Sequence, residues 1–490
     1  MSQIADLIAR SARQFGSKPC LVEGERVVSF ADFDAATNRY ANAFLALGLS
    51  QGDRVGVLLP NGIDCLLAYY GLAKAGLVRV SLNSRDTASD LRFKLAEVGA
   101  RAVLVGADTP DLGVEIALPP GKVRASLDAA SDDPTGVERS LDEPYRLGFT
   151  GGTTGRPKAV TLTERGELAE LSAFLTDLVP DINADDRFLH AAPIAHASGA
   201  FFLPALVRGA TSLVMAKFLA DEFVALAAST RATITFLVPT MLAVLLEEPG
   251  LENAELTLRR IAYGASPIAP ALYARAEERF GPIFAQTYGQ AESPMVITCL
   301  KPDEHDRIGS CGRPFTLAQV AVMDDDGKLL PPGSVGEIVV KGPQLMARYW
   351  NREDATAEAF RGGWLHTGDI GQMDEDGFFY LLDRKGDMLI SGGYNVYPRE
   401  VEDVLLAFPG VVEAAVIGLP DEKWGERVHA VVSGHGIDTA ALAAHAKAAL
   451  ADYKAPKSVE VWDTLPKSPA NKILRRKVRR LVLEEGEVTV

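Results

Sequence analysis

The chain has 490 residues, of which 47% are hydrophobic and 23% are charged, and it contains 44 glycines and 28 prolines. A single hydrophobic core rarely organises more than about 250–300 residues, so more than one domain is expected, and the ordinary composition excludes a fibrous or disordered protein. The formal net charge of −15 argues against nucleic acid and anionic membranes as partners, so phosphate binding must be local.

The sequence favours a cytoplasmic protein without a membrane span. The chain has four cysteines, which are Cys20, Cys65, Cys299 and Cys311. Their spacing fits neither a metal site nor a disulfide scaffold, which indicates a reducing compartment. The N-terminus lacks the apolar region of a signal peptide. The most apolar stretch, 232–246, contains Pro239 and is shorter than the roughly 20 residues of a membrane span, so we expect a buried strand followed by a helix.

Helical and strand patterns alternate through the first half of the chain. Residues 30–47 place apolar side chains at helical spacing, with Ser29 and Asp32 as a capping box and Gly48 as a stop. The next predicted elements are a strand at 54–60, a helix at 66–76, and strands near Val80, 212–218, 232–239 and 259–266. This alternation predicts layered α/β structure.

The C-terminal part shows a different pattern. Residues 316–383 predict short strands joined by turns, a β-rich section that closes the large domain. After Asp383 we expect one short helix, two strands, an Ala-rich helix near 439–452 and a basic final segment, which together suit a small α+β domain of about 100 residues. The predicted organisation is an N-terminal domain over 1–383, a hinge over 384–387 and a C-terminal domain over 388–490.

A loop rich in glycine and threonine, FTGGTTGRPK, occupies residues 149–158. Its candidate phosphate-binding residues are Thr150, Gly151, Gly152, Thr153, Thr154, Gly155 and Lys158. Backbone N–H groups and hydroxyls of such a loop can face phosphate oxygens without obstruction. Because Arg156 and Pro157 separate the last glycine from the lysine, it is not the nucleotide-binding P-loop, and the flanking sequences predict a loop between two strands. By itself the segment suits a flexible surface hairpin equally well.

Six further segments follow in a fixed order. They are APIAHASG (192–199), YGASP (263–267), QTYGQAES (286–293), GWLHTGD (363–369), DRKGDMLISGGYNVYPREVE (383–402) and LPKSPANKILRR (465–476). Over nearly the whole chain, this series resembles the adenylate-forming superfamily of acyl-CoA synthetases, peptide-synthetase adenylation domains and beetle luciferases. The resemblance implies an acyl-CoA synthetase that converts a carboxylic acid and ATP, with Mg²⁺, into acyl-AMP and then transfers the acyl group to coenzyme A.

The resemblance also implies a nucleotide site. Asp369, together with Arg384, would bind the ribose hydroxyls. Glu292 would hold Mg²⁺ and so take part in catalysis, since Mg²⁺ prefers a carboxylate plus phosphate oxygens. Tyr288 would border the adenine and the acyl pocket. The remaining nucleotide-binding residues would be Gly264, Ala265, Ser266, Thr287 and Gly289.

Three roles fall to the C-terminal part by the same resemblance. Lys472 would be catalytic, because a lysine between the attacking carboxylate and the α-phosphate stabilises the meeting of two anions. After adenylation the small domain would rotate about the hinge at Gly386 and withdraw this lysine. The pantetheine of CoA would then pass along Ser391, Gly392, Gly393 and Tyr394.

The acyl pocket is expected to be apolar. His196 would gate it toward the pantetheine channel and so count as catalytic, and Phe201 and Val238 would line it together with Tyr288. These residue types suit a fatty, alicyclic or aryl acid.

Four positions depart from the family pattern and place efficient adenylation in question. They are Gly151 for serine, Ala291 for threonine, Gly386 for aspartate or lysine, and Asn471 for glycine. Alternatives to the synthetase are thioesterification of preformed acyl-AMP, adenylation for a carrier protein, a non-catalytic nucleotide or acyl-CoA binding protein and, remotely, a luciferase-like oxygenase. The sequence names neither the acid nor the oligomeric state, with a homodimer left open.

Overall fold

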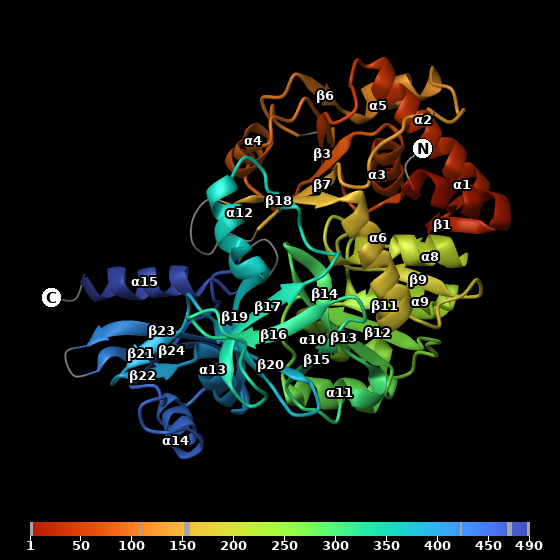
Figure 1. The fold of residues 1–490 in the computed structure, drawn as a ribbon. Coiled ribbons are helices and arrows are strands. Elements are labelled where there is room, and N and C mark those ends of the chain that lie inside the picture. The colour runs from red at the N-terminus through yellow and green to blue at the C-terminus, as the bar shows by residue number, and fades with distance from the viewer. Residues whose placement is uncertain (1–2, 108, 151–156, 422–423, 468–472, 488–490) are drawn as a thin grey trace.

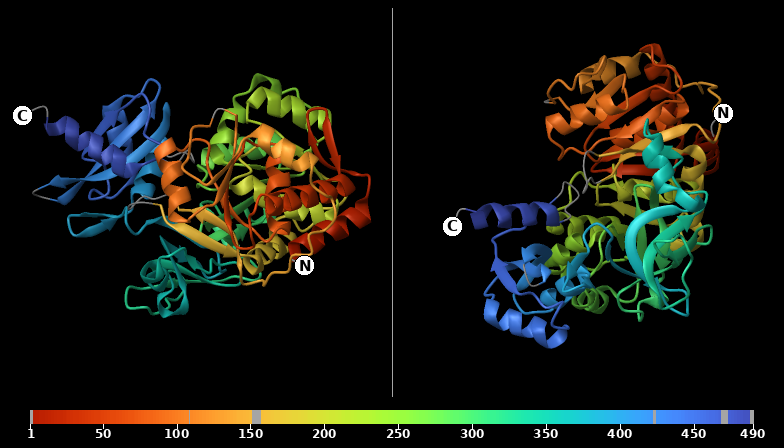
Figure 2. Two further views of the ribbon diagram at one scale, coloured as in Figure 1. Left: turned by 90° about the horizontal axis from the view of Figure 1, so that it is seen from above. Right: turned by 60° about the vertical axis from the view of Figure 1, so that its left-hand side comes forward.

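The structure, a computed structural model, describes residues 3–107, 109–150, 157–421, 424–467 and 473–487. Figure 1 shows a large body built on two sheets, with the C-terminal part as a smaller lobe on the left. Two further views show the same lobe projecting from the body (Figure 2). This architecture confirms the predicted α/β class, including the β-rich section and the small α+β part.

The first sheet has seven strands. In spatial order they are β18 (Arg348–Tyr349), β8 (Ala159–Thr163), β7 (Pro144–Phe149), β4 (Val78–Ser81), β3 (Arg54–Leu58), β5 (Ala102–Val105) and β6 (Ile116–Leu118). The strands β7, β4, β3, β5 and β6 run parallel, whereas β8 is antiparallel to β7 and β18 is antiparallel to β8. Strands β7 and β8 flank the glycine-rich segment in sequence, as the flanking residues predicted.

Helices of the N-terminal part follow the predicted alternation. They are α1 (Gln3–Phe15), α2 (Phe30–Ala46), α3 (Ile63–Lys74), α4 (Ala88–Glu97), α5 (Pro120–Asp128) and α6 (Glu164–Ala173). Helix α2 begins as expected, because the Ser29 hydroxyl accepts a hydrogen bond from the Asp32 N–H at 3.0 Å. Helix α3 buries every residue except Asp64, since it packs against α1, α2 and strands of both sheets.

The second sheet has 13 strands. In spatial order they are β16 (Gln319–Met323), β17 (Val335–Lys341), β19 (Leu365–Met373), β20 (Phe379–Arg384), β15 (Ser310–Pro314), β14 (Ser293–Leu300), β13 (Phe284–Gln290), β12 (Arg260–Gly264), β11 (Ile234–Leu237), β9 (Arg187–His190), β10 (Thr211–Val214), β1 (Pro19–Glu23) and β2 (Arg26–Ser29). From β13 to β1 the neighbours run parallel, and from β16 to β14 they run antiparallel. The antiparallel half is the predicted β-rich section.

Six more helices accompany this sheet. They are α7 (Ala197–Ala200), α8 (Phe202–Arg208), α9 (Ala220–Thr230), α10 (Pro239–Leu246), α11 (Pro270–Phe280) and α12 (Glu353–Ala359). The apolar stretch 232–246 forms strand β11 and helix α10, as predicted. Helix α12 was not predicted, because its segment has no apolar face and no residue of it is buried.

The C-terminal lobe contains a five-stranded sheet. Its strands are β22 (Tyr394–Val396), β21 (Leu389–Ser391), β24 (Gly425–Gly434), β23 (Val411–Asp421) and β25 (Ser458–Val461), with β25 paired to β24. Its helices are α13 (Pro398–Leu406), α14 (Thr439–Ala449) and α15 (Arg475–Glu487). The basic final segment thus forms a helix, α15. The division into domains at 383 and 387 stays a prediction.

A buried ion cluster ties α6 to the first sheet. Arg146 of β7 donates from Nε to Glu167 at 2.7 Å and from a terminal nitrogen to Glu170 at 3.0 Å. One guanidinium therefore serves two buried carboxylates. Burial raises the pKa of Glu170 to about 8, with Arg146 opposing the rise and the charge of Glu167 adding to it.

Stability should therefore fall as the pH rises from 4.5, the ordinary pKa of a glutamate, to about 8. In this window the folded chain keeps a proton on Glu170 that the unfolded chain has released, so unfolding is favoured by rising pH. Glu170→Gln should flatten this dependence, by on the order of 5 kcal/mol across the window. Urea unfolding at several pH values measures the pH dependence of the free energy of unfolding, and Glu252→Gln, at an exposed position, is the control. An equal pH slope in both variants would contradict the prediction.

Candidate active site

Several of the predicted nucleotide and acyl residues gather at one edge of the second sheet. The strands β9, β11, β12 and β13 are parallel neighbours, so their carboxyl ends meet at the same edge (Figure 1). His196 follows β9, Val238 follows β11, and Ser266 follows β12. Ligands of open α/β sheets bind at this edge, in the crevice outside the carboxyl ends. Segments about 100 positions apart in the chain thereby form one candidate site.

Gly264, at the end of β12, lies very close to the neighbouring strand. A Cβ at this position would stand 2.4 Å from the carbonyl oxygen of Thr287. The next residue, Ala265, is exposed and has φ +69°, in the left-handed region that few non-glycine residues adopt. The strand end therefore turns sharply and leaves backbone at the edge of the sheet, as expected for a segment that borders a ligand.

Gly264→Ala should destabilise the protein by about 1–3 kcal/mol, because the added methyl group meets backbone that cannot move without shifting β13. It should also weaken nucleotide binding. Denaturant unfolding and AMP titration measure the two effects. Gly121→Ala is the matched control, since nothing lies within 4 Å of a Cβ at Gly121. If Gly264→Ala and Gly121→Ala had the same free energy of unfolding, the close approach at Gly264 would not contribute to stability.

Two of the predicted residues in β13, Thr287 and Gly289, are also tightly packed. The Thr287 hydroxyl donates to the carbonyl oxygen of Met295, in the antiparallel neighbour β14. A Cβ at Gly289 would lie 2.4 Å from the Met295 nitrogen. The turn between β13 and β14, which carries Glu292, is therefore held rigidly in place.

Asp369 of β19 is the centre of the best-formed polar group. Its carboxylate accepts a hydrogen bond from the Tyr288 hydroxyl at 2.6 Å and pairs with Arg384 Nε at 3.1 Å. Arg384 lies opposite Asp369 in the register of β19 and β20. Burial, and then the charge of Asp369, raise the pKa of Tyr288, and Asp369 is the main cause of the raised pKa of Arg384. The structure thus brings together three residues predicted for the ribose and adenine.

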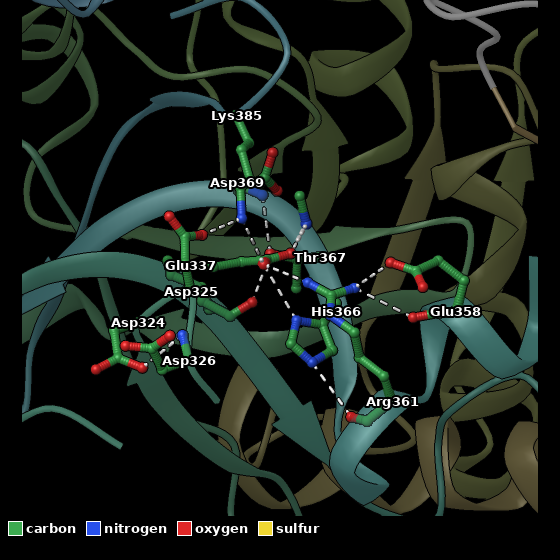
Figure 3. A network of polar contacts seen from close by, with 12 residues as sticks. Asp324, Asp325, Asp326, Glu337, Glu358, Arg361, His366, Thr367, Asp369 and Lys385 are labelled. Atoms are coloured by element: carbon green, nitrogen blue, oxygen red, sulfur yellow. Dashed lines mark hydrogen bonds and ion pairs between the residues drawn. The ribbon is translucent and has the colours of Figure 1, made fainter. Parts of the chain in front are cut away.

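A second carboxylate, Glu337 of β17, holds the backbone beside Asp369. Glu337 accepts hydrogen bonds from Arg361, His366 and the Gly368 N–H, and the Lys385 ammonium lies 3.6 Å from it as an ion pair (Figure 3). The Gly368 N–H donates at 3.0 Å, which fixes the residue immediately before Asp369. Although burial alone would raise it, the donors His366 and Gly368 hold the pKa of Glu337 below its usual value. Sequence analysis did not find Glu337, because a single glutamate in a strand carries no signal of its partners.

The residue after Arg384 belongs to the same network. Lys385 donates from Nζ to Asp325 at 2.6 Å and lies 3.6 Å from Glu337, and its backbone N–H donates to the Gly368 carbonyl oxygen at 2.8 Å. The start of the predicted hinge is therefore attached to the strand that carries Asp369.

Glu292 and Lys158 both contact the side chain of Tyr349. The Tyr349 hydroxyl donates to Glu292 Oε1 at 2.6 Å, and the Lys158 ammonium lies 4.2 Å from the centre of the Tyr349 ring. Lys158 also closes the neck of the glycine-rich loop, since Thr150 and Lys158 exchange two hydrogen bonds of 3.0 and 3.1 Å. The predicted residues Gly151, Gly152, Thr153, Thr154 and Gly155 lie outside the described residues.

The donor set at Glu292 suits magnesium that arrives with a nucleotide. Within the described ranges, no three His, Cys, Asp or Glu side chains converge to form a metal cage. Mg²⁺ is commonly held by one or two carboxylates together with substrate phosphates and water. The single carboxylate of Glu292 fits that arrangement. A bound Mg²⁺ would neutralise charge on the phosphates.

The residues predicted for CoA form a tight hairpin in the C-terminal lobe. Ser391 pairs with Tyr394, so Gly392 and Gly393 form a two-residue loop, with φ values of +60° and +82°. Both glycines are needed for this turn type. Ser391 is buried, whereas Tyr394 is 62% exposed and contacts the ring of Tyr453. The hairpin therefore presents backbone and one exposed aromatic side chain.

Lys472 and Asn471 lie outside the described residues, but the residues that flank them are paired. Lys467 and Ile473 form an antiparallel bridge, so the residues that precede and follow the segment with Lys472 lie next to each other.

Arg475, the first residue of α15, attaches the end of that segment to the predicted hinge. It pairs with Asp383 at 2.9 Å, with Asp387 at 3.2 Å and with Glu402 at 2.6 Å. Gly386 lies between Asp383 and Asp387 in the sequence. The hinge prediction itself is not tested by the geometry.

The acyl residues differ in exposure. His196 is exposed, and its Nε2 lies 3.1 Å from Asn83 Nδ2. Val238 is half-buried at the start of α10. Phe201 has no exposed surface and packs against Phe188 and other core aromatics, so it lies behind the surface of the site.

Comparison with known proteins agrees with this geometry. Residues 8–350 match the AMP-binding enzyme family and residues 400–472 match the AMP-binding enzyme C-terminal domain. The chain is 37% identical over 511 residues to a medium/long-chain-fatty-acid–CoA ligase of Mycobacterium tuberculosis, covering 96% of this chain and 89% of that protein. It is 38% identical over 483 residues to a feruloyl-CoA synthase of Amycolatopsis sp, covering 96% and 97%.

A solved structure supports the same class. The o-succinylbenzoate CoA synthetase of Bacillus subtilis, in complex with the acyl-adenylate intermediate OSB-AMP, matches with a TM-score of 0.89 at 31% identity, over 96% of this chain and 97% of that one. Fold and site together define an adenylate-forming enzyme. The chain belongs to the AMP-binding enzyme family, which confirms the resemblance seen in the motifs and the expected AMP-forming acid–thiol ligase. The expected use of ATP, Mg²⁺ and CoA agrees with this family.

Proposed function

We propose that the protein converts a hydrophobic carboxylic acid, ATP and CoA into acyl-CoA, AMP and pyrophosphate through an acyl-AMP intermediate. The observation that most supports this is the joining of Asp369, Tyr288 and Arg384 beside the carboxyl edge of the second sheet. Asp369 accepts from Tyr288 on one carboxylate oxygen and pairs with Arg384 on the other, and a carboxylate with two oxygens is the acceptor that a pair of ribose hydroxyls requires.

The remaining roles are proposed on the same basis. Lys158, with the glycine-rich loop, binds phosphate oxygens, and Glu292 binds Mg²⁺. Lys472 stabilises the charge that develops as the acid attacks the α-phosphate. The thiol of CoA then attacks the acyl-AMP, with AMP as leaving group, after the lobe that carries the hairpin at Gly392 has moved about Gly386.

The acid is proposed to be fatty, alicyclic or aryl. Relatives that act on fatty acids, ferulate and succinylbenzoate support this range. Val238 and the neighbouring Met241 are partly buried against the aromatic core around Phe201, which makes this flank of the edge apolar.

A panel of carboxylic acids, scored by mass spectrometry for acyl-AMP and for acyl-CoA, tests the proposal. We expect both products from the cognate acid when ATP, Mg²⁺ and CoA are present. Acyl-AMP without acyl-CoA would indicate another acceptor, such as a carrier protein. Neither product from any acid or from synthetic acyl-AMP would contradict an active ligase and favour the non-catalytic alternative.

Thioesterification of preformed acyl-AMP is the second candidate. The departures at Gly151 and Ala291 favour it, because each removes a hydroxyl donor to phosphate worth roughly 0.5–1.5 kcal/mol. The departures at Gly386 and Asn471 add to this, because they change the hinge and the loop that delivers Lys472. Acyl-CoA formation from synthetic acyl-AMP should then be faster than from acid and ATP. Fast acid-dependent pyrophosphate exchange would exclude this candidate.

A cytoplasmic location is proposed as well. The four cysteines are buried free thiols, as a reducing compartment allows. Among the described helices, none combines the length and apolarity that a membrane crossing requires. A homodimer stays a prediction from the sequence.

A further inference from the structure

Residues 346–350 connect the two sheets at the candidate nucleotide site. The Met346 N–H donates to the Glu292 carbonyl oxygen at 2.8 Å, which attaches the segment to the β13–β14 turn. The Trp350 N–H donates to the Ala159 carbonyl oxygen at 2.8 Å, and Tyr349 pairs with β8. One short segment thus holds both the turn that carries Glu292 and the strand that follows the glycine-rich loop.

The side chain of Tyr349 also connects the two sheets, because it contacts the charged groups of Glu292 and Lys158. Tyr349 is 6% exposed, its hydroxyl donates to Glu292 Oε1 at 2.6 Å, and its ring faces the Lys158 ammonium at 4.2 Å. The hydroxyl is the donor of this hydrogen bond, because an ionised carboxylate can only accept. A hydrogen bond to an ionised acceptor is stronger than one between neutral groups.

This arrangement keeps an acid and a base apart that would otherwise attract each other. Lys158 and Glu292 are half-buried and oppositely charged, and the ring of Tyr349 contacts Lys158 while its hydroxyl bonds Glu292. A direct Lys158–Glu292 ion pair would neutralise the two groups that a metal–triphosphate ligand needs separately. With Oε1 occupied by the Tyr349 hydroxyl, Glu292 Oε2 remains for a cation, while the ammonium remains for phosphate.

We propose that Tyr349 is a positioning residue that fixes the Glu292 carboxylate and the Lys158 ammonium at the spacing required by a metal–triphosphate group. The inference rests on the proposed function, because it takes Glu292 as the metal ligand. Tyr349 itself touches neither the acid nor the thiol in this role, and it acts through the two residues that it holds.

Tyr349→Phe tests the hydroxyl alone, since the phenylalanine keeps the ring beside Lys158. Mn²⁺ binding to the enzyme–ATP complex, followed by electron paramagnetic resonance, should weaken roughly tenfold. AMP affinity, measured by calorimetry without metal, should not change. Tyr273→Phe is the matched control, because it removes an equivalent hydroxyl–carboxylate bond of 2.8 Å, to Glu277 on α11, away from the site. Unchanged Mn²⁺ affinity in Tyr349→Phe would overturn the proposal.

A double-mutant cycle separates positioning from a general structural role. If Tyr349 acts through Glu292, Tyr349→Phe should cause no further loss of Mn²⁺ affinity in a Glu292→Gln background. An equal loss in both backgrounds would overturn the proposal. Two other outcomes would overturn the assignment of Glu292 as metal ligand, and with it the basis of the Tyr349 proposal. One is a wild-type ATP affinity that does not depend on metal, and the other is wild-type Mn²⁺ affinity in Glu292→Gln.

Tyr349→Leu tests the ring. It should weaken ATP binding several-fold even without metal, whereas Tyr349→Phe should not, because only leucine removes the aromatic face beside Lys158. Equal metal-free ATP affinity in the leucine and phenylalanine variants would overturn the part of the proposal that concerns Lys158.

Discussion

Lys472→Ala is expected to lower acid-dependent pyrophosphate exchange by about 10²–10³-fold, because it removes the positive charge from the place where carboxylate and α-phosphate meet. Thioester formation from synthetic acyl-AMP and CoA should be largely unaffected. The two half-reactions are measured separately, the first by isotope exchange and the second by the appearance of acyl-CoA.

The exposed Lys477 of α15 supplies the control for this variant. Lys477→Ala removes the same charge from the same basic region and should leave both half-reactions intact. If Lys472→Ala slowed both half-reactions equally, Lys472 would support the fold or the docking of the lobe, and the proposed catalytic role would be wrong.

Asp369→Asn is expected to weaken the binding of both ATP and AMP by about 10–100-fold. The amide keeps the size of the side chain but loses the charge that Arg384 pairs with and one of the two acceptor oxygens. Because the ribose is common to both nucleotides, the two affinities should fall together, unlike the metal-dependent effect expected at Tyr349. Calorimetric titration with AMP and with ATP measures this.

Asp325→Asn is the control, since Asp325 is exposed and pairs with Lys385, outside the ribose contacts. It should bind AMP like the wild type. Wild-type AMP affinity in Asp369→Asn would remove Asp369 from the ribose site, and a lowered unfolding midpoint in that variant alone would indicate a loss of structure instead.

Much of the fold followed from local patterns in the sequence. The helix that starts after Ser29 begins there because a hydroxyl caps it, and the stretch 232–246 divides at Pro239 because proline is favoured in the first turn of a helix. These signals lie within a few residues of the structure that they determine. Helix α15 was missed because its long basic run hides the two buried valines, Val478 and Val482, that attach it to the lobe.

The candidate site was predictable only in part. The motifs supplied Asp369, Tyr288 and Arg384, and the structure places them in mutual contact. Tyr349 and Glu337 carry no such signal, because an aromatic residue or a glutamate in a strand is ordinarily a packing or surface residue. Their importance comes from pairing across strands that are distant in the chain, and one sequence does not show such pairing.

The buried carboxylate of Glu337 has a thermodynamic consequence for the predicted hinge. It accepts a hydrogen bond from the N–H of Gly368, next to Asp369, and forms an ion pair with the ammonium of Lys385, next to Gly386. A nucleotide that favours one arrangement of this shared acceptor must bind that arrangement more tightly by the same factor, whichever event comes first. If the lobe turns at the predicted hinge, occupation of the proposed ribose site and the orientation of the lobe should therefore be two readouts of one coupling free energy, and AMP affinity measured in each orientation would give its value.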